Sequence, residues 1–352
     1  MRTGDAVSLL QLPAYSNARP WVRTAVLRPE LGSLVAAALL FIFFSIASSG
    51  AMLEVPTIAR VLDTAWPYGI IAVAVGLLMI SGEFDLSAGV MVGTAGALLG
   101  VMATEWGMNL WAAVFLSLLV CLALGLWNGV LVVWTGLPSF VITLGTFFGL
   151  RGANVALSKY FTGDALIENI DDAGGYDSLH TIVATVFGTA PSDFRVSLIW
   201  WAAFILIATW ILWRTKIGNW IFASGGDRDA ARAVGVPVNG TKIGLFMLTA
   251  GAAWFVGVSS AIRYTSVQAG QGVGQEFFYI IAAVVGGCRM AGGYGSAVGP
   301  AIGALIWGIA FVGIPHAGWN SDWRWAFLGV LLLVATLINH VVGERVRTAR
   351  SG

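Results

Sequence analysis

The sequence predicts an all-α membrane protein, a polytopic bundle of about ten transmembrane helices with both termini in the cytoplasm. Three observations lead to this prediction. Of the 352 residues, 58% are hydrophobic and only 11% are charged, whereas soluble domains carry about 25% charged residues. Apolar runs close to the ~20 residues that a membrane helix needs recur along the whole chain. The 16 Trp and 45 Gly suit rings at membrane interfaces and small residues at helix contacts.

The chain begins with a mixed polar stretch, residues 1–30, which holds four arginines and precedes the first apolar run. Positive charge before an apolar run is also typical of a cleaved signal peptide. The run 31–49 is long, however, and the chain stays apolar after it. We therefore expect 1–30 to be a cytoplasmic segment and 31–49 to be an uncleaved first span.

The transmembrane domain is expected to cover 31–342, followed by a cytoplasmic tail, 343–352. Nine further apolar runs are candidate spans: 57–80, 86–104, 109–134, 138–157, 197–213, 243–262, 276–288, 297–314 and 325–342. An even number of spans returns both termini to the same side of the membrane. The run 276–288 is short and ends in glycines, so it is the span with the least support.

Basic residues set the orientation, because Lys and Arg collect in cytoplasmic loops. With the N-terminus inside, thirteen basic residues fall in inner segments and six in outer segments or at span ends. This balance predicts that both termini and the 214–242 segment are cytoplasmic and that 158–196 is periplasmic. Arg151, one of the outer six, is expected to snorkel from near a span end.

The periplasmic segment 158–196 is acidic, with six carboxylates. Within it, Ser178–Phe187 is either a short interfacial helix or part of a solvated loop. An acidic outer surface is a possible platform for a soluble partner.

The polar segment 214–242 interrupts the apolar runs and carries a compact helix signal. Asp227 can act as an N-cap, two helical turns can follow, Gly235 can end them, and Pro237 blocks continuation. We expect Ala230, Ala231 and Val234 to share one side of this helix. A short helix held at a membrane surface can transmit force or dock a partner, and eight residues of this segment are candidates for such coupling: Gly225, Gly226, Asp227, Arg228, Ala230, Ala231, Arg232 and Gly235.

An energy source within this chain is not predicted. The three lysines, Lys159, Lys216 and Lys242, are not followed by Ser or Thr and lack the preceding glycines of a P-loop. The chain is therefore expected to bind no cofactor itself; if ATP drives it, a partner subunit must hold the ATP and Mg. No chain of carboxylates or histidines crosses a span, which disfavours a proton relay.

Polar residues within or between the spans are candidates for a solute pathway. The alternative for Asn128, Thr143, Thr146 and Asn154 is hydrogen bonding between neighbouring helices. Asp85 can instead cap a helix that begins at Leu86, and Glu83 is expected to face headgroups or water. The candidate pathway residues are Glu83, Asp85, Asn128, Thr143 and Asn154.

Other chemistry is disfavoured. Cys121 and Cys288 lie in apolar runs and are expected to be buried, and the three histidines show no metal-ligand spacing. The net charge of +1 implies no nucleic-acid partner. The sequence contains no recognisable catalytic constellation, so a membrane enzyme is disfavoured.

Three motifs together resemble the ribose- and xylose-type permeases of ABC importers. They are Gly82–Gly89 (GEFDLSAG), Gly218–Gly235 around the polar helix, and Gly286–Ser296 (GGCRMAGGYGS). Leu137–Gly145 and the pair Arg151-Gly152 fit the same family, and the similarity runs over about 35–340. Members of the family often carry Asn where Asp227 stands, and either residue can cap a helix.

The resemblance implies a permease for a simple sugar or polyol in the inner membrane of a bacterium. Its implied partners are ABC ATPase subunits, a periplasmic sugar-binding protein, and a second permease copy in a homodimer or heterodimer. A branched-chain amino-acid permease of related fold is one alternative. An ion-coupled carrier that works without an ATPase is the other.

Overall fold

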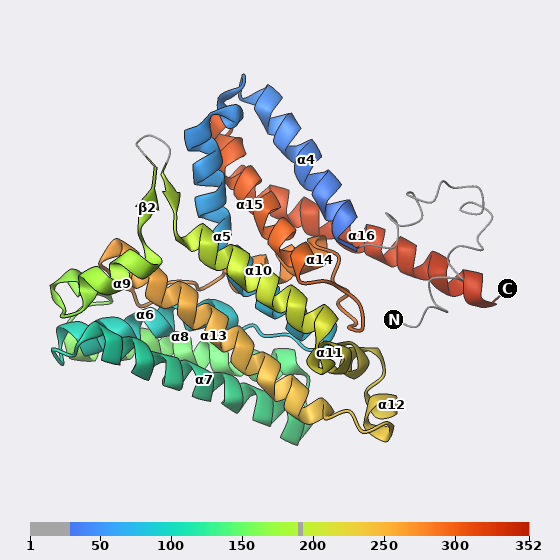
Figure 1. Cartoon of the computed structure of the whole chain (residues 1–352), viewed down its shortest axis with the longest axis horizontal. Helices are drawn as coiled ribbons and strands as arrows, with labels where there is room; N and C mark the ends of the chain where they lie inside the picture. The colour runs from blue at the N-terminus through green and yellow to red at the C-terminus, as the bar shows by residue number, and fades with distance from the viewer. Residues whose placement is uncertain (1–28, 189–192, 352) are drawn as a thin grey trace.

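The computed structural model describes residues 29–188 and 193–351, which are mostly helical (Figure 1). Ten helices stand where the ten spans are predicted: α4 Pro29–Ala47, α5 Val55–Ile80, α6 Ala88–Thr104, α7 Leu110–Thr135, α8 Ser139–Thr162, α10 Ser197–Arg214, α13 Val238–Tyr264, α14 Glu276–Val285, α15 Val298–His316 and α16 Trp323–Ser351. Seven are long and apolar enough to cross a membrane, while α6, α14 and the Trp323–Leu337 part of α16 are shorter apolar helices. The predicted all-α polytopic bundle is confirmed.

The predicted boundaries at the two ends of the chain can be compared with the structure only at the C-terminal end. Almost all of the predicted segment 1–30 lies outside the described residues. At the other end, α16 continues as one helix through most of the predicted tail 343–352, up to Ser351. The predicted boundary at residue 342 is therefore not a break in the helix.

Helix α6 is the most enclosed element, because neighbours pack on it from several sides. Helices α7, α8 and α13 lie together with it in the lower half of Figure 1. Gly89, Gly93, Gly96 and Gly100 recur every three or four residues and so line one face of α6. A Cβ on Gly93 would lie 2.6 Å from the carbonyl oxygen of Gln271. The glycine face of α6 thus admits another backbone at close range.

The backbone that approaches α6 belongs to the connection between α13 and α14. Helix α13 ends at Tyr264, and α14 begins only at Glu276. Between them, β4 (Val267–Gln268) pairs with β1 (Leu166–Ile167), and the chain then runs without regular structure to Gln275. This connection, which the sequence assigns to an outer loop, lies along the glycine face of α6, from Val267 at Gly96 to Glu276 at Gly89.

One end of the bundle, here the α9 end, is built from the 158–196 segment. It contains β1, the 3₁₀ helix η2 (Ile170–Asp172), α9 (Tyr176–Val183) and a hairpin of β2 (Val186–Phe187) with β3 (Phe194–Arg195). The predicted helix 178–187 is thus present as α9, but it begins two residues earlier and ends four residues sooner.

An ion-pair cluster fixes the α9 end to the bundle. Asp63 of α5 accepts hydrogen bonds from both terminal nitrogens of Arg263 of α13, at 2.8 and 2.6 Å. Arg195 of β3 lies 3.8 Å from the same carboxylate. A bidentate guanidinium–carboxylate pair fixes orientation as well as distance, so α5, α13 and the β2–β3 hairpin are held together.

The opposite end, here the α12 end, contains the polar segment 214–242. Helix α10 is followed by α11 (Lys216–Gly226) and α12 (Arg228–Ala233). Asp227 caps α12 as predicted: its Oδ1 accepts from the backbone N–H groups of Asp229 and Ala230, at 3.1 and 3.0 Å. Gly235 follows with φ 82°, and Pro237 stands just before α13.

Gly225 and Gly226 at the end of α11 are adjacent but stand in opposite surroundings. A Cβ on Gly225 would overlap the carbonyl oxygen of Ile80 and lie 2.8 Å from the Gly293 nitrogen, whereas a Cβ on Gly226 would have nothing within 4 Å. We therefore expect Gly225→Ala to lower the midpoint of thermal unfolding of the detergent-solubilised protein, because two stretches of backbone must move apart. Gly226→Ala is the matched control and should unfold like the parent protein. Equal midpoints for the two variants would contradict this close packing.

Candidate functional site

Three stretches that are far apart in the sequence meet at the α12 end: the loop 81–87, the end of α11, and the loop 286–296. The Gly293 N–H donates a 2.8 Å hydrogen bond to the Ile80 carbonyl oxygen. A Cβ on Gly292 would lie 2.9 Å from both the Gly225 oxygen and the Gly82 Cα. Glycine is needed at these contacts because any side chain would push the backbone segments apart. The three motifs found in the sequence therefore form one structural unit, here called the glycine junction.

The loop 81–87 carries irregular backbone, and side chains from α8 satisfy it. The Phe84 N–H donates to Ser139 Oγ and the Leu86 N–H to Thr143 Oγ1, both at 3.0 Å. A buried N–H without a partner would destabilise the protein. Ser139 and Thr143 thus replace the carbonyl groups that a continuous helix would supply.

Asp85 closes a turn instead of capping a helix that begins at Leu86. Its Oδ1 accepts from the Ser87 N–H at 2.8 Å and from the Ser87 hydroxyl at 2.6 Å, and α6 begins only at Ala88. Asn128 of α7 donates to Ser87 Oγ at 2.9 Å and accepts from Thr146 of α8 at 2.6 Å. A chain of hydrogen bonds therefore links the loop to α7 and α8.

All five candidate pathway residues are buried within the chain. Asn154 of α8 completes the pattern, since its amide lies 3.1 Å from the Thr94 hydroxyl of α6. Each of the five is at most 9% exposed: Glu83, Asp85, Asn128, Thr143 and Asn154. The hydrogen bonds of Asn128, Thr143 and Asn154 correspond to the packing alternative that the sequence left open. A role of the five residues in solute passage stays a prediction.

Glu83 does not face headgroups or water, so that expectation is wrong. Its carboxylate forms an ion pair with the Lys242 ammonium, and the two side chains are only 12% and 6% exposed. A buried carboxylate needs a partner of opposite charge because its own hydration is lost. This contact cannot be predicted from local sequence patterns, because the two residues are 159 positions apart.

Helix α12 projects from the bundle in Figure 1 and is exposed on one side. Val234 is 79% exposed, and Ala230 and Ala233 are exposed beside it, but Ala231 is 4% exposed. The expectation that Ala231 shares the side of Ala230 and Val234 is therefore wrong. At 3.6 residues per turn, consecutive residues lie about 100° apart, so Ala231 faces the bundle.

The remaining coupling candidates surround this exposed surface. Arg232 donates to the Asn239 side-chain oxygen at 2.9 Å and lies 3.9 Å from an Asp229 carboxylate oxygen. Asp227, Gly226 and Gly235 are exposed, and Arg228 is partly exposed. The structure brings the eight candidates together at one end of the bundle. Of these, Gly225 and Ala231 pack against the rest of the bundle.

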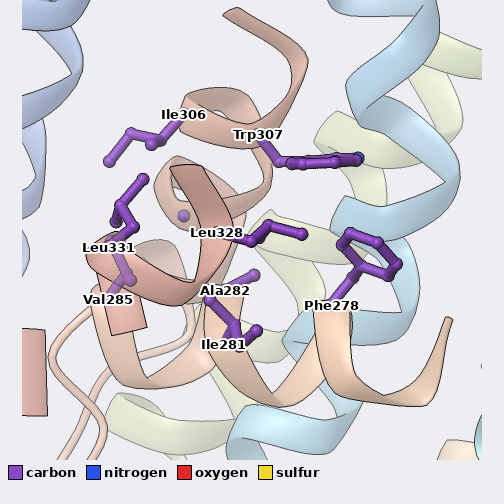
Figure 2. A pocket seen from close by; sticks show the side chains of 9 residues that line it. Phe278, Ile281, Ala282, Val285, Ile306, Trp307, Leu328 and Leu331 are labelled. Atoms are coloured by element: carbon purple, nitrogen blue, oxygen red, sulfur yellow. The ribbon is translucent and has the colours of Figure 1, made fainter. Parts of the chain in front are cut away.

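Among the described residues, two of the cavities lie outside the glycine junction. The one in Figure 2 lies among α14, α15 and α16 and is lined by apolar side chains, with a volume of about 10 Å³. That is close to the least space that holds one water molecule, so it is a packing gap. The other, of about 670 Å³, opens at the α9 end and is lined by four carboxylates among its polar groups: Glu105, Asp164, Glu168 and Asp172.

Comparison with known proteins gives consistent matches over most of the chain. The family described as "Branched-chain amino acid transport system / permease component" matches residues 57–336. The probable ABC transporter permease protein YphD of Escherichia coli K12 is 33% identical over 91% of this chain and 92% of its own length. The autoinducer 2 import system permease protein LsrC of Salmonella typhi is 30% identical over 88% of this chain and 84% of its own. The xylose transport system permease protein XylH of Haemophilus influenzae is 26% identical over 87% and 94%. No solved structure matches the chain.

The Lys242–Glu83 pair gives a direct test of the junction. Lys242→Met should lower the free energy of unfolding by about 3 kcal/mol, because it leaves a buried carboxylate without its partner. Thermal unfolding in detergent measures the loss. The double variant Lys242→Met with Glu83→Met serves as the control and should recover most of the stability, since similar apolar volume replaces the pair. A single variant as stable as the parent protein would show that the pair is not formed.

Proposed function

The chain belongs to the family of branched-chain amino acid transport system permease components, and on that premise we propose that it is the permease subunit of an ABC importer for a simple sugar or polyol. The observation that carries the proposal is the match to ABC permeases over about nine-tenths of the chain. As in those relatives, the chain is a multi-pass membrane protein. The proposed location is the inner membrane of a bacterium.

The solute class rests on the named relatives. One is a permease for xylose and another a permease for autoinducer 2, although the description of the family names branched-chain amino acids. The motif GEFDLSAG and the polar helix also resemble sugar permeases. A sugar or polyol is therefore preferred to leucine or its analogues as the transported solute.

The proposed energy source is ATP hydrolysis on separate subunits, which hold the ATP and Mg. The exposed side of α12 is a suitable docking surface, because it combines the apolar residues Ala230, Ala233 and Val234 with charged neighbours. This assignment puts the α12 end in the cytoplasm and the α9 end in the periplasm. It agrees with the bias of basic residues toward the N-terminal segment and 214–242.

The proposed partners follow from the same orientation. Two ATPase subunits dock on the α12 surfaces of two permease copies, which pair as a homodimer or a heterodimer. A periplasmic sugar-binding protein docks on the α9 end, where the 158–196 segment and the acidic cavity are presented. The solute passes between the copies, and this chain changes no covalent bond.

Movement of α12 has a physical route to the membrane interior. Helix α12 leads within four residues into α13, and Lys242 on the second turn of α13 holds Glu83 in the loop 81–87. That loop is bonded in turn to α7 and α8 through Asn128 and Thr143. A shift of the docked helix is therefore passed to the start of α6.

The solute class is tested on the purified cognate binding protein. We expect D-ribose, D-xylose, D-galactose or ribitol to raise the thermal unfolding midpoint of that protein, because a bound ligand stabilises the folded state. L-Leucine is the comparison ligand and should have no effect. Stabilisation by L-leucine and by none of the sugars or ribitol would favour the amino-acid alternative.

The docking surface is tested by a charge at Val234. Val234→Glu should reduce uptake into proteoliposomes that contain permease, ATPase and binding protein by at least tenfold, because a buried carboxylate opposes an apolar contact. ATP hydrolysis should become independent of the loaded binding protein. Val234→Ala at the same position keeps the surface apolar and should transport normally. Unimpaired uptake by the Glu variant would rule out this side of α12 as the ATPase contact.

A further inference from the structure

Arg151 occupies an unexpected position in a membrane helix. It is twelve residues from Ser139 and eleven from Thr162, so it stands at the middle of α8 and not near a span end as the sequence suggested. Its side chain is exposed on the surface of the chain. In the part of the chain that the structure describes, it forms no hydrogen bond or ion pair, although it interacts electrostatically with the Glu276 carboxylate.

Snorkelling does not account for this arginine. The hydrocarbon layer is about 30 Å thick, so the centre of α8, a helix of about 36 Å, is roughly 15 Å from either edge. An arginine side chain is much shorter than this distance. Because a guanidinium in contact with lipid at mid-membrane is strongly unfavourable, the surface around Arg151 faces water or protein.

The connection between α13 and α14 comes near Arg151 at Glu276. On α6, Val90 and Thr94 face Asn154 of α8. Gly89 and Gly93, one residue earlier in each turn, face the irregular connection at Glu276 and Gln271. Residues one position apart on a helix point about 100° apart, so α8 and the connection flank α6 on neighbouring faces.

The connection also presents a polar side chain at the depth of Gly93. Gln271 is partly exposed, and among the described residues its amide side chain has no hydrogen-bond partner. Irregular backbone at membrane depth is tolerated only where protein buries it or where it lines a water-filled cavity. The partly exposed amide favours the second of these conditions.

We propose that Arg151 and Gln271 line the transport passage within the membrane and hold a neutral polyhydroxylated solute there, with a second copy of the chain closing the opposite side. The amide of Gln271 offers both donors and acceptors, and the guanidinium offers five donors. The hydroxyl groups of a sugar or polyol complement both. This inference rests on the proposed function and adds the surface that the solute contacts.

The groups at this surface suit a neutral solute. The Glu276 carboxylate, which is 4% exposed and accepts from the backbone N–H of Gly274 at 3.0 Å, is close enough to Arg151 to interact with it electrostatically. A carboxylate near the guanidinium weakens the attraction of that guanidinium for an anionic solute. Hydrogen bonds without net charge also hold a solute weakly enough for it to leave on the other side.

Access to water is the first test, and it does not depend on the solute or the ATPase. Arg151→Cys and Gln271→Cys are placed in nanodiscs, which leave both membrane faces open, and treated with a positively charged methanethiosulfonate. Both variants should react, because the reagent modifies thiolates in water. The background is low because the native Cys121 and Cys288 are fully buried.

The control for this labelling is Leu206→Cys on α10, a mid-helix position that is 69% exposed but surrounded by apolar residues. It should not react at a comparable rate. Rates for Arg151→Cys and Gln271→Cys as low as the control rate would overturn the proposal, because the surface would then face lipid or a dry contact between copies.

Solute contact is the second test, with tritiated D-ribose, D-xylose and D-galactose in proteoliposomes that hold the complete transporter. Arg151→Gln should lower the maximal uptake rate about tenfold, leave KM unchanged and leave the stimulation of ATP hydrolysis by the binding protein intact. The reason is that capture and coupling lie elsewhere, while the solute loses its place in the passage. Arg151→Lys should restore part of the rate.

The outcomes separate this proposal from the proposed function. Normal uptake by Arg151→Gln, or an equal loss of uptake and of ATP hydrolysis, would overturn the solute-contact role. A parent transporter that takes up none of the three sugars, while the thiol labelling succeeds, would instead count against the proposed solute class and leave the water-lined surface intact.

Discussion

Two ion pairs join α13 to α5, and they determine which parts of the bundle can move relative to each other. Both cations belong to α13, where Lys242 and Arg263 are twenty-one residues or about 31 Å apart. Their partners are Glu83, just after α5, and Asp63 within it. This separation matches the hydrocarbon thickness, so each pair lies near one edge of the membrane. The two antiparallel helices are therefore fixed at both ends and act as one rigid body.

This rigid body explains how a surface contact can affect the interior. Helix α12 leads directly into α13, and Gly225 at the end of α11 rests on the Ile80 carbonyl at the end of α5. The polar segment 214–242 thus contacts both α5 and α13. Close-packed interiors transmit displacement instead of absorbing it, so a force on α12 moves the nearest halves of α5 and α13 together.

The sequence predicted the elements well and their contacts poorly. The helix positions, the Asp227 cap and the three motifs of the glycine junction follow from local apolar runs, turn residues and glycine spacing. The Lys242–Glu83 pair could not be predicted, because it joins residues 159 positions apart. Ala231 was misplaced because the side of a six-residue helix that faces the bundle is decided by tertiary packing. The connection before Glu276 is polar, so the sequence predicts an outer loop there. Irregular backbone can nevertheless lie at membrane depth where it does not meet lipid.

The two ion pairs between α5 and α13 also restrict where a solute can cross. A passage between α5 and α13 would require both ion pairs to break in each cycle, and separating buried charges is strongly unfavourable. A passage along the glycine face of α6 would displace backbone packed at contact distance. Among the described residues, a polar surface at mid-membrane is left where Arg151 of α8 is exposed near the connection between α13 and α14. Because this surface is open on one side, the passage proposed here requires a second copy of the chain to enclose the solute.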